Sequence, residues 1–422
     1  MKSGRRLLWA EVALATSAFA ALSIAVLTVA AQTAEPDDGA YRASIVAITD
    51  GHLFTLTNAQ ATDLAASLND NPTEPPNQWT QLPDGHYISE KDPGYPYLAA
   101  PFESLGIIRW APLFYGALAC VGLFVGARRW LGRFGGAAAV GLFCSSGAAL
   151  AFAWRDYMPT FTDTSLVAAG TGALLWAVVA SESSIHRRTW VGLAGFVAIE
   201  LATFVRYTNV VILGCAVVAV ILVWWRRPTL LPLRRLCWGL ASVVVFAAGV
   251  LSFDDRIYGG PLTTGYQPGE VTFALDAMTK NLSILPKHLM KAMPMLVLGL
   301  VAVVWIVARA VMLRRNAADA GAVARRDLWV GLALAASWLS IWALYFAYTW
   351  TLDPTNVTVQ LVRFYLPAIG AISLLGAWLV TRIPGPAWRA GSATLVTTAV
   401  LFGLGVWSFH AMYAAFGVPL SG

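Results

Sequence analysis

The chain has 422 residues, of which 58% are hydrophobic and only 12% are charged, and its mean hydropathy is +0.63. A soluble protein of this length has too little interior to bury so much apolar surface, so the composition indicates an integral membrane protein. We expect an all-α polytopic membrane protein with about eleven transmembrane helices and a large first extracytoplasmic loop. The expected spans are 7–31, 107–127, 134–153, 162–180, 189–205, 207–225, 236–253, 293–313, 328–348, 364–381 and 391–413.

The net charge of +6 is explained by membrane topology. With the N-terminus in the cytoplasm, 19 of the 29 Lys and Arg residues fall on the cytoplasmic side, as the positive-inside rule requires. The basic balance therefore gives no support for nucleic-acid binding. High Ala, Arg and Gly usage is typical of a GC-rich bacterial gene, so we expect a multi-pass protein of the bacterial inner (plasma) membrane.

The one long polar segment, 32–106, contains 11 of the 23 acidic residues. Helical apolar spacing predicts a helix from Gly39 to Thr49 and a second from Ala59 to Leu68, followed by a hairpin from Trp79 to Ile88. The chain divides into a first transmembrane helix (1–31), an extracytoplasmic loop domain (32–106), transmembrane helices 2–7 (107–253), an extracytoplasmic loop with an interfacial helix (254–292) and transmembrane helices 8–11 (293–422).

Two adjacent carboxylates, Asp37 and Asp38, lie a few residues beyond the first span. Acids at this position also suit the N-terminus of a helix, so a structural role is an alternative. A carboxylate pair at the rim of a membrane span is placed to act on a polar acceptor that arrives from water while the lipid phase supplies a donor.

The acidic pair is the first of six short motifs that follow one another along the chain. They are Asp37-Asp38-Gly39-Ala40-Tyr41, Lys91-Asp92-Pro93-Gly94-Tyr95-Pro96, Thr162-Asp163, Phe204-Val205-Arg206-Tyr207-Thr208-Asn209, Gly259 to Tyr266 and Arg363 to Pro367. In this order they resemble the GT-C superfamily of polyprenyl-phosphate-sugar-dependent glycosyltransferases, which includes protein O-mannosyltransferases, lipid A aminoarabinose transferases and actinobacterial arabinosyltransferases. The resemblance covers about residues 30–370. It implies an inverting hexosyl- or pentosyltransferase whose acceptor is a cell-envelope glycan, a lipid or a protein.

Transfer from a polyprenyl phosphate needs one base, because the phosphate leaves without an acid. Asp37 matches the leading acid of the family's pair and is our first choice for the base, with Asp38 second. The resemblance makes Asp163 a further acidic residue of the catalytic site, although an acid in the first turn of a helix is also favoured by capping alone.

The donor phosphate needs cations near the outer lipid–water boundary. Lys91, Arg206 and Arg363 lie at span ends on that side and are the expected phosphate ligands. Arg206 could instead pair with Glu200, and Arg155 could form a local ion pair with its neighbour Asp156.

The same motifs supply an expected substrate pocket. Its residues are Tyr41, Tyr95, Arg155, Asp156, Tyr266 and Tyr365. His52 and His86 match no metal motif, so we expect no metal and no cofactor, with the lipid-linked sugar as donor substrate.

Two other classes of protein remain as alternatives. An O-antigen ligase or polymerase would use a similar donor, but its main outer loop usually lies late in the chain. A secondary transporter would also have many spans, but no inverted repeat is visible.

Overall fold

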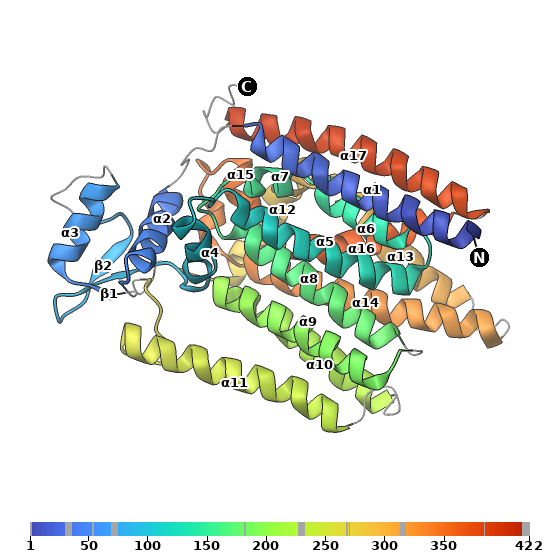
Figure 1. Ribbon diagram of the computed structural model, residues 1–422, viewed down its shortest axis with the longest axis horizontal. Coiled ribbons are helices and arrows are strands. Elements are labelled where there is room, and N and C mark those ends of the chain that lie inside the picture. The colour runs from blue at the N-terminus through green and yellow to red at the C-terminus, as the bar shows by residue number, and fades with distance from the viewer. Residues whose placement is uncertain are drawn as a thin grey trace.

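The protein is a bundle of long apolar helices with a small α/β cap at one end (Figure 1). The computed structural model describes residues 2–29, 36–52, 55–68, 75–180, 183–226, 233–266, 269, 271–312, 318–383 and 385–415. The bundle contains α1 (Lys2–Leu27), α5 (Trp110–Leu131), α6 (Gly135–Cys144), α7 (Gly147–Ala153), α8 (Thr160–Val179), α9 (Ile185–Val205), η1 (Tyr207–Asn209), α10 (Val210–Arg226), α11 (Leu233–Tyr258), α12 (Leu275–Ala292), α13 (Leu296–Met312), α14 (Ala318–Phe346), η3 (Thr349–Leu352), α15 (Thr358–Val362), η4 (Leu366–Ala368), α16 (Ile369–Thr381) and α17 (Ala387–Ala415).

Eight helices of the described chain are long and apolar enough to cross a membrane, or ten if each of two bent helix pairs counts as one span. The multi-pass membrane protein expected from composition is therefore confirmed, whereas the count of eleven is not. The bent pairs are α6 with α7, at 64°, and α12 with α13, at 108°. The helical segment Leu366–Thr381 falls below the required length.

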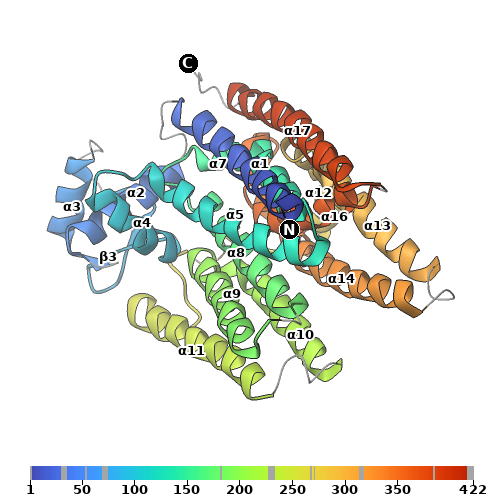
Figure 2. The ribbon, with the colours of Figure 1, turned by 45° about the vertical axis from the view of Figure 1, so that its right-hand side comes forward.

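The interior of the bundle is formed by α6, α7, α8 and α16, whose residues are mostly buried. Small residues allow close packing there, since a Cβ on Gly122 of α5 would approach the Ala169 carbonyl oxygen of α8 to 2.5 Å. At the periphery, α11 lies beyond α9 and α10 in both ribbon views (Figure 2). Only 6% of its most apolar window is buried, the lowest share among the candidate spans of the described chain.

The cap is built by the segment between α1 and α5. It contains α2 (Pro36–Thr49), β1 (Thr55–Leu56), α3 (Asn58–Ser67), β2 (Trp79–Gln81), β3 (Tyr87–Ser89) and α4 (Gly94–Ser104). The strands form an antiparallel sheet in the order β1-β3-β2. The two helices and the hairpin expected from the sequence are present. A small apolar core that includes Ala43, Leu56 and Trp79 joins the sheet to α2 and α3.

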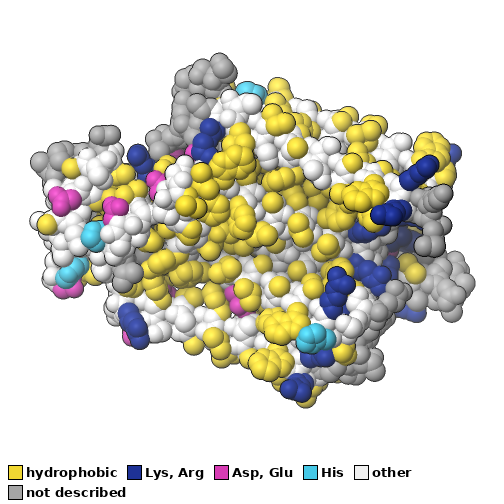
Figure 3. All heavy atoms as spheres, in the orientation of Figure 1, with side chains coloured by type: hydrophobic (Ala, Val, Ile, Leu, Met, Phe, Trp, Pro, Cys, Tyr) yellow, Lys and Arg dark blue, Asp and Glu magenta, His cyan; other side chains and the backbone are white. Residues whose placement is uncertain are grey.

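The two ends of the bundle differ in charge. Apolar side chains cover the middle of the face drawn in Figure 3, and Lys and Arg side chains gather toward the end that carries the N-terminus. We call that end the inner end and the end with the cap the outer end.

An ion cluster closes the inner end. Asp327 of α14 is buried and accepts a 2.5 Å hydrogen bond from Arg382, which follows α16, and one from each of the Trp130 and Trp378 indoles, both at 3.0 Å. Arg309 and Arg326 lie 3.8 Å from the same carboxylate. We call these four charged residues the inner ion cluster. It ties α5, α13, α14 and α16 together.

Candidate active site

Two glycines bring the motif residues together at the outer end. A Cβ on Gly94 would lie 2.3 Å from the Phe204 carbonyl carbon, so only glycine lets α4 begin against the end of α9. A Cβ on Gly265 would lie 2.4 Å from the Ser89 carbonyl oxygen, so the chain after α11 also passes close to the Lys91 segment. As a result, residues from α2, α4, α9 and the Arg363 segment meet in one place.

Asp37, in the first turn of α2, lies between two cations. Its Oδ1 is 3.0 Å from Lys91 Nζ, and its Oδ2 is 2.7 Å from an Arg363 guanidinium nitrogen. The Gln78 side-chain amide donates a third contact, at 3.0 Å. The side chains of Asp37, Lys91 and Arg363 are 17%, 6% and 12% exposed, so the group is shielded but still reachable. We call Asp37, Lys91 and Arg363 the outer ion cluster.

The charges of this cluster set the proton affinity of Asp37. Burial raises the pKa of the carboxyl, but Arg363 and Lys91 together outweigh that effect and hold the pKa well below its usual range. Asp37 is therefore ionised at neutral pH as long as both cations stay in contact with it. Its proton affinity rises if an incoming anion draws the two cations away.

The second acid of the pair has different surroundings. Asp38 contacts the Arg155 guanidinium, and the two side chains are only 2% and 1% exposed. An acceptor cannot reach a carboxylate that is enclosed in this way. The ion pair of Asp38 with Arg155 instead holds α2 against the segment that precedes α8. The local ion pair of Arg155 with Asp156, which the sequence left as a possibility, is not formed among the described residues: Asp156 lies 3.8 Å from Arg109 instead.

A third acid–base pair lies beside the outer ion cluster. Asp163, in the first turn of α8 and fully buried, is 3.4 Å from Arg206, which ends α9. Arg206 also donates to the Thr160 hydroxyl at 3.0 Å and to the Arg363 carbonyl oxygen at 3.1 Å. The alternative pairing of Arg206 with Glu200 is wrong, since the Glu200 carboxylate accepts from Ser242.

The four tyrosines of the expected pocket lie in three places. Tyr266 lies near the ions, because Lys91 Nζ is 5.1 Å from the centre of its ring. Tyr41 and Tyr95 are buried behind Asp37 with their rings edge to face, and the Tyr95 hydroxyl donates to the Asp156 carbonyl oxygen. Tyr365 is fully buried against Trp342 and its hydroxyl has no hydrogen-bond partner among the described residues, so it belongs to the helix core.

Sequence reasoning missed two residues at the site. Gln78 contacts Asp37 and has a φ of 60°, in the left-handed region that non-glycine residues seldom adopt. Asp92, the variable position of the Lys-x-Pro-Gly motif, lies half-buried between Lys91 and α4. Its position inside the Lys-x-Pro-Gly motif was the available signal, but an acid before proline is also typical of an ordinary turn.

Comparison with known proteins identifies the fold. No protein-family model matches the chain, and no curated protein matches it in sequence. The crystal structure of ArnT from Cupriavidus metallidurans bound to undecaprenyl phosphate aligns with a TM-score of 0.55 and 14% identity, over 97% of this chain and 76% of that one. The apo structure of ArnT aligns with a TM-score of 0.53 and 15% identity over the same shares. The chain has a GT-C fold.

The resemblance drawn from the sequence motifs is thereby confirmed at the level of the fold. Within this GT-C fold, Asp37, Lys91, Arg363, Asp163 and Arg206 lie together at the outer end. Among the described residues, no group of three or more His, Cys, Asp or Glu side chains is arranged to hold a metal ion.

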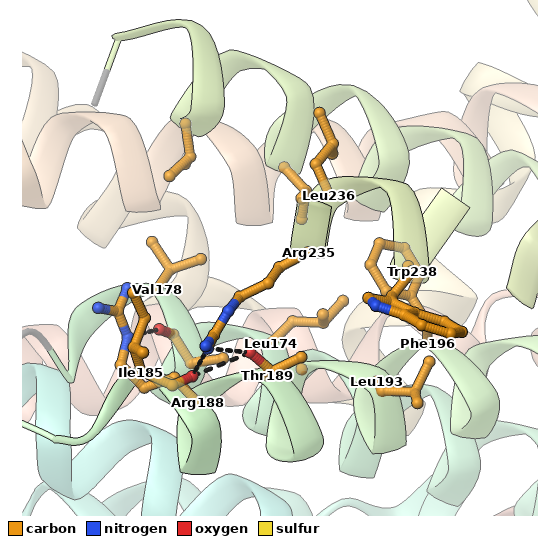
Figure 4. A pocket seen from close by; sticks show the side chains of 15 residues that line it. Leu174, Val178, Ile185, Arg188, Thr189, Leu193, Phe196, Arg235, Leu236 and Trp238 are labelled. Carbon is orange, nitrogen blue, oxygen red and sulfur yellow. Dashed lines mark hydrogen bonds between the residues drawn. The ribbon is translucent and has the colours of Figure 1, made fainter. Parts of the chain in front are cut away.

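A cavity of about 60 Å³ lies elsewhere, between α8, α9, α10 and α11 (Figure 4). Apolar side chains such as Leu174, Phe196 and Trp238 line it, and Arg235 crosses it to contact Thr189. It adjoins the ends of α8 and α9 opposite to Asp163 and Arg206. The cavity is therefore remote from the acid–base groups and is not part of the candidate active site.

Proposed function

We propose that the protein is an integral membrane inverting glycosyltransferase that moves a sugar from a polyprenyl-phosphate donor to an extracytoplasmic acceptor. One observation carries the proposal: Lys91 and Arg363 converge on a single carboxylate at the outer end of a GT-C fold. The ArnT structure with this fold contains undecaprenyl phosphate, which supports a lipid-linked phosphate as the ligand class.

In this proposal the donor phosphate exchanges with Asp37. Two cations held about 3 Å from one carboxylate are also placed to bind a phosphate, because both anions accept charge-assisted hydrogen bonds of similar length. Asp37 keeps the cations in position before the donor arrives. Arg206, whose guanidinium donates to the Arg363 carbonyl oxygen, supports the Arg363 segment and adds positive potential.

The exchange also prepares Asp37 as the base. When the phosphate draws Lys91 and Arg363 away, the pKa of the Asp37 carboxyl rises toward its ordinary value and the group becomes a better proton acceptor. The acceptor hydroxyl then attacks the anomeric carbon on the face opposite the phosphate. The new carbon–oxygen bond forms, the bond to the phosphate breaks, the hydroxyl proton passes to Asp37 and polyprenyl phosphate leaves. A single displacement of this kind inverts the configuration.

For the sugar, the acceptor and the membrane topology, the proposal is the one that the sequence led us to expect. The transferred sugar is a hexose or a pentose, and the acceptor is a cell-envelope glycan, a lipid or a protein. The basic inner end supports a cytoplasmic N-terminus and an extracytoplasmic site in the bacterial inner membrane. Asp163 and Asp38 act through Arg206 and Arg155, which they hold in place.

Equilibrium binding of polyprenyl phosphate to purified protein tests the phosphate site. Arg363→Ala and Lys91→Ala should each weaken binding by about tenfold or more, because each removes a charge-assisted contact worth roughly 1.5–3 kcal/mol. Arg256→Ala is the matched control, since it removes an exposed cation from the same end of the protein. Equal binding by wild type and both site variants would contradict the proposal.

A transfer assay tests the reaction. Purified protein should release polyprenyl phosphate from at least one member of a panel of polyprenyl-phosphate hexoses and pentoses, with the sugar appearing on acceptor or water in the inverted configuration. Release with retained configuration would exclude the single displacement.

A further inference from the structure

The cavity between α8, α9, α10 and α11 lies at the inner end of the bundle. It adjoins the last turns of α8 and α10 and the first turns of α9 and α11. Two of its lining side chains, Ile185 and Trp238, are 39% and 58% exposed, so the cavity reaches the surface of the bundle. Because all four helices are candidate membrane spans, this opening faces lipid near one surface of the membrane.

Two arginines line this cavity. Arg188 of α9 is buried, and its Nε donates to the Ala177 carbonyl oxygen at 2.9 Å. Arg235 reaches from α11 across to α9, where one of its guanidinium nitrogens contacts both the Ile185 carbonyl oxygen and the Thr189 hydroxyl (Figure 4). The two guanidinium groups are close enough for their positive charges to repel each other. None of the described residues that line the cavity is acidic, so an anion placed between the two arginines would offset this repulsion.

Further from the helix ends the lining becomes apolar. Leu193 and Phe196 follow Arg188 along α9, and Phe196 lies roughly 12 Å deeper in the bundle at a rise of ~1.5 Å per residue. Val220 and Val223 of α10 line the same space. A ligand that matches this change in polarity has an anionic group near the membrane surface and a hydrocarbon chain beyond it.

The volume of the cavity suits one part of such a ligand. It measures about 60 Å³. A buried water needs about 10–15 Å³, so there is room for about four waters or for a group of similar size, such as a phosphate. The remainder of a lipid would extend through the opening beside Trp238, whose exposed indole is a side chain typical of the membrane interface.

We propose that this cavity binds an anionic phospholipid from the leaflet at the inner end. Its phosphodiester lies between Arg188 and Arg235, and the first part of an acyl chain lies against Leu193 and Phe196. A basic recess between transmembrane helices is a recognised setting for anionic lipid headgroups. The lipid contacts both α9 and α11, so its binding stabilises the packing of α11, the least buried of the spans. This inference needs only the membrane-spanning fold and does not depend on the proposed reaction.

The test measures the melting temperature of the purified protein in a non-ionic detergent while phosphatidylglycerol is added. A ligand that binds only the folded protein raises this temperature, so we expect a saturable rise. Phosphatidylcholine, which has the same chains but no net charge, should bind roughly tenfold more weakly or worse. Glycerophosphoglycerol, which is the headgroup without chains, and inorganic phosphate should cause no rise at the same concentration.

Variants of the two arginines locate the site. Arg188→Gln and Arg235→Gln should each weaken the apparent affinity for phosphatidylglycerol by about tenfold, because each removes a charge-assisted contact. Arg234→Gln is the matched control, since it removes an exposed arginine next to Arg235 and should weaken the affinity by less than about threefold. Val223→Phe fills the cavity from α10 and keeps both arginines, so it should also weaken binding and serves if the arginine variants do not fold.

Three results would overturn the inference. The first is equal affinity for phosphatidylglycerol in wild type, Arg188→Gln and Arg235→Gln. The second is equal affinity of the wild-type protein for phosphatidylglycerol and phosphatidylcholine, which would show that chains alone are recognised. The third is an equal rise with inorganic phosphate, which would show a site for a free anion instead of a lipid.

Discussion

The two ion clusters use the same residue types for different purposes. In the inner ion cluster, Asp327 is only 2% exposed and both of its oxygens accept indole hydrogen bonds, so the carboxylate has little room for another partner. In the outer ion cluster, Asp37 is 17% exposed and no indole encloses it among the described contacts. A saturated carboxylate holds helices together, whereas a reachable one between two cations marks a place where an anion can be exchanged.

The largest effect should come from removing the inner carboxylate. Asp327→Ala leaves three arginines and two indoles without their shared acceptor, which should lower the free energy of unfolding by about 3–5 kcal/mol, toward the lower value because the arginines are partly exposed. Thermal unfolding in detergent measures this. Transfer per folded molecule should stay near the wild-type rate, and a fully stable variant without activity would reverse the comparison.

Removing the outer carboxylate, in contrast, should impair transfer more than it impairs stability. Asp37→Asn keeps the shape and a hydrogen-bond acceptor but loses the base and the charge, so transfer should drop by ~10²-fold or more. The free energy of unfolding should also fall, because Lys91 and Arg363 lose their charged partner, but by less than in Asp327→Ala. Polyprenyl phosphate should bind as tightly as to wild type or more tightly, since its competitor for Lys91 and Arg363 is gone. Retained transfer in Asp37→Asn together with lost transfer in Asp38→Asn would move the base by one residue.

The effect of pH on stability should be smaller. Burial raises the folded pKa of Asp92 to about 7, above its ordinary value of 3.8, so the folded protein binds more protons than the unfolded chain between these values. The free energy of unfolding should therefore fall as the pH rises from 5.5 to about 7, by at most about 2 kcal/mol in total. Melting temperatures at pH 5.5 and 8 should show this fall in wild type, and an equal fall in Asp92→Asn would assign it to other groups.

The smallest effect concerns the ring beside Lys91. Tyr266→Leu removes a cation–π contact worth about 0.5–1 kcal/mol, so polyprenyl phosphate affinity should change by only about two- to fivefold. Tyr365→Phe is the comparison, because the hydroxyl of this core residue has no hydrogen-bond partner in the described parts of the chain and should be dispensable for binding. A larger loss in Tyr365→Phe than in Tyr266→Leu would place the pocket deeper in the bundle.

Local features of the fold were readable from the sequence. The helix at 36–49, the helix at 58–67 and the hairpin at 79–89 follow from apolar spacing and turn residues. The span count was less certain because α6 and α7 bend where Ser145 and Ser146 interrupt one apolar window. The apolar window at 364–381 crosses η4 before α16 begins, so its longest α-helix runs only from Ile369 to Thr381.

The partners in the ion pairs could not be predicted from the sequence in the same way. From the sequence we considered Asp156 as a partner for Arg155 and Glu200 as a partner for Arg206, because spacing along one helix or loop can suggest only near neighbours. The actual pairs join residues 117 positions apart, as for Arg155 and Asp38, or 326 apart, as for Arg363 and Asp37. Such contacts depend on how the helices pack, which cannot be inferred from residue spacing in a single sequence.

A structure determined with bound polyprenyl phosphate tests the central claim most directly. The phosphate should lie within hydrogen-bonding distance of Lys91 Nζ and the Arg363 guanidinium, with Asp37 released from at least one of the two cations and the inner ion cluster unchanged. A phosphate bound elsewhere, with both contacts of Asp37 intact, would contradict the proposed phosphate site.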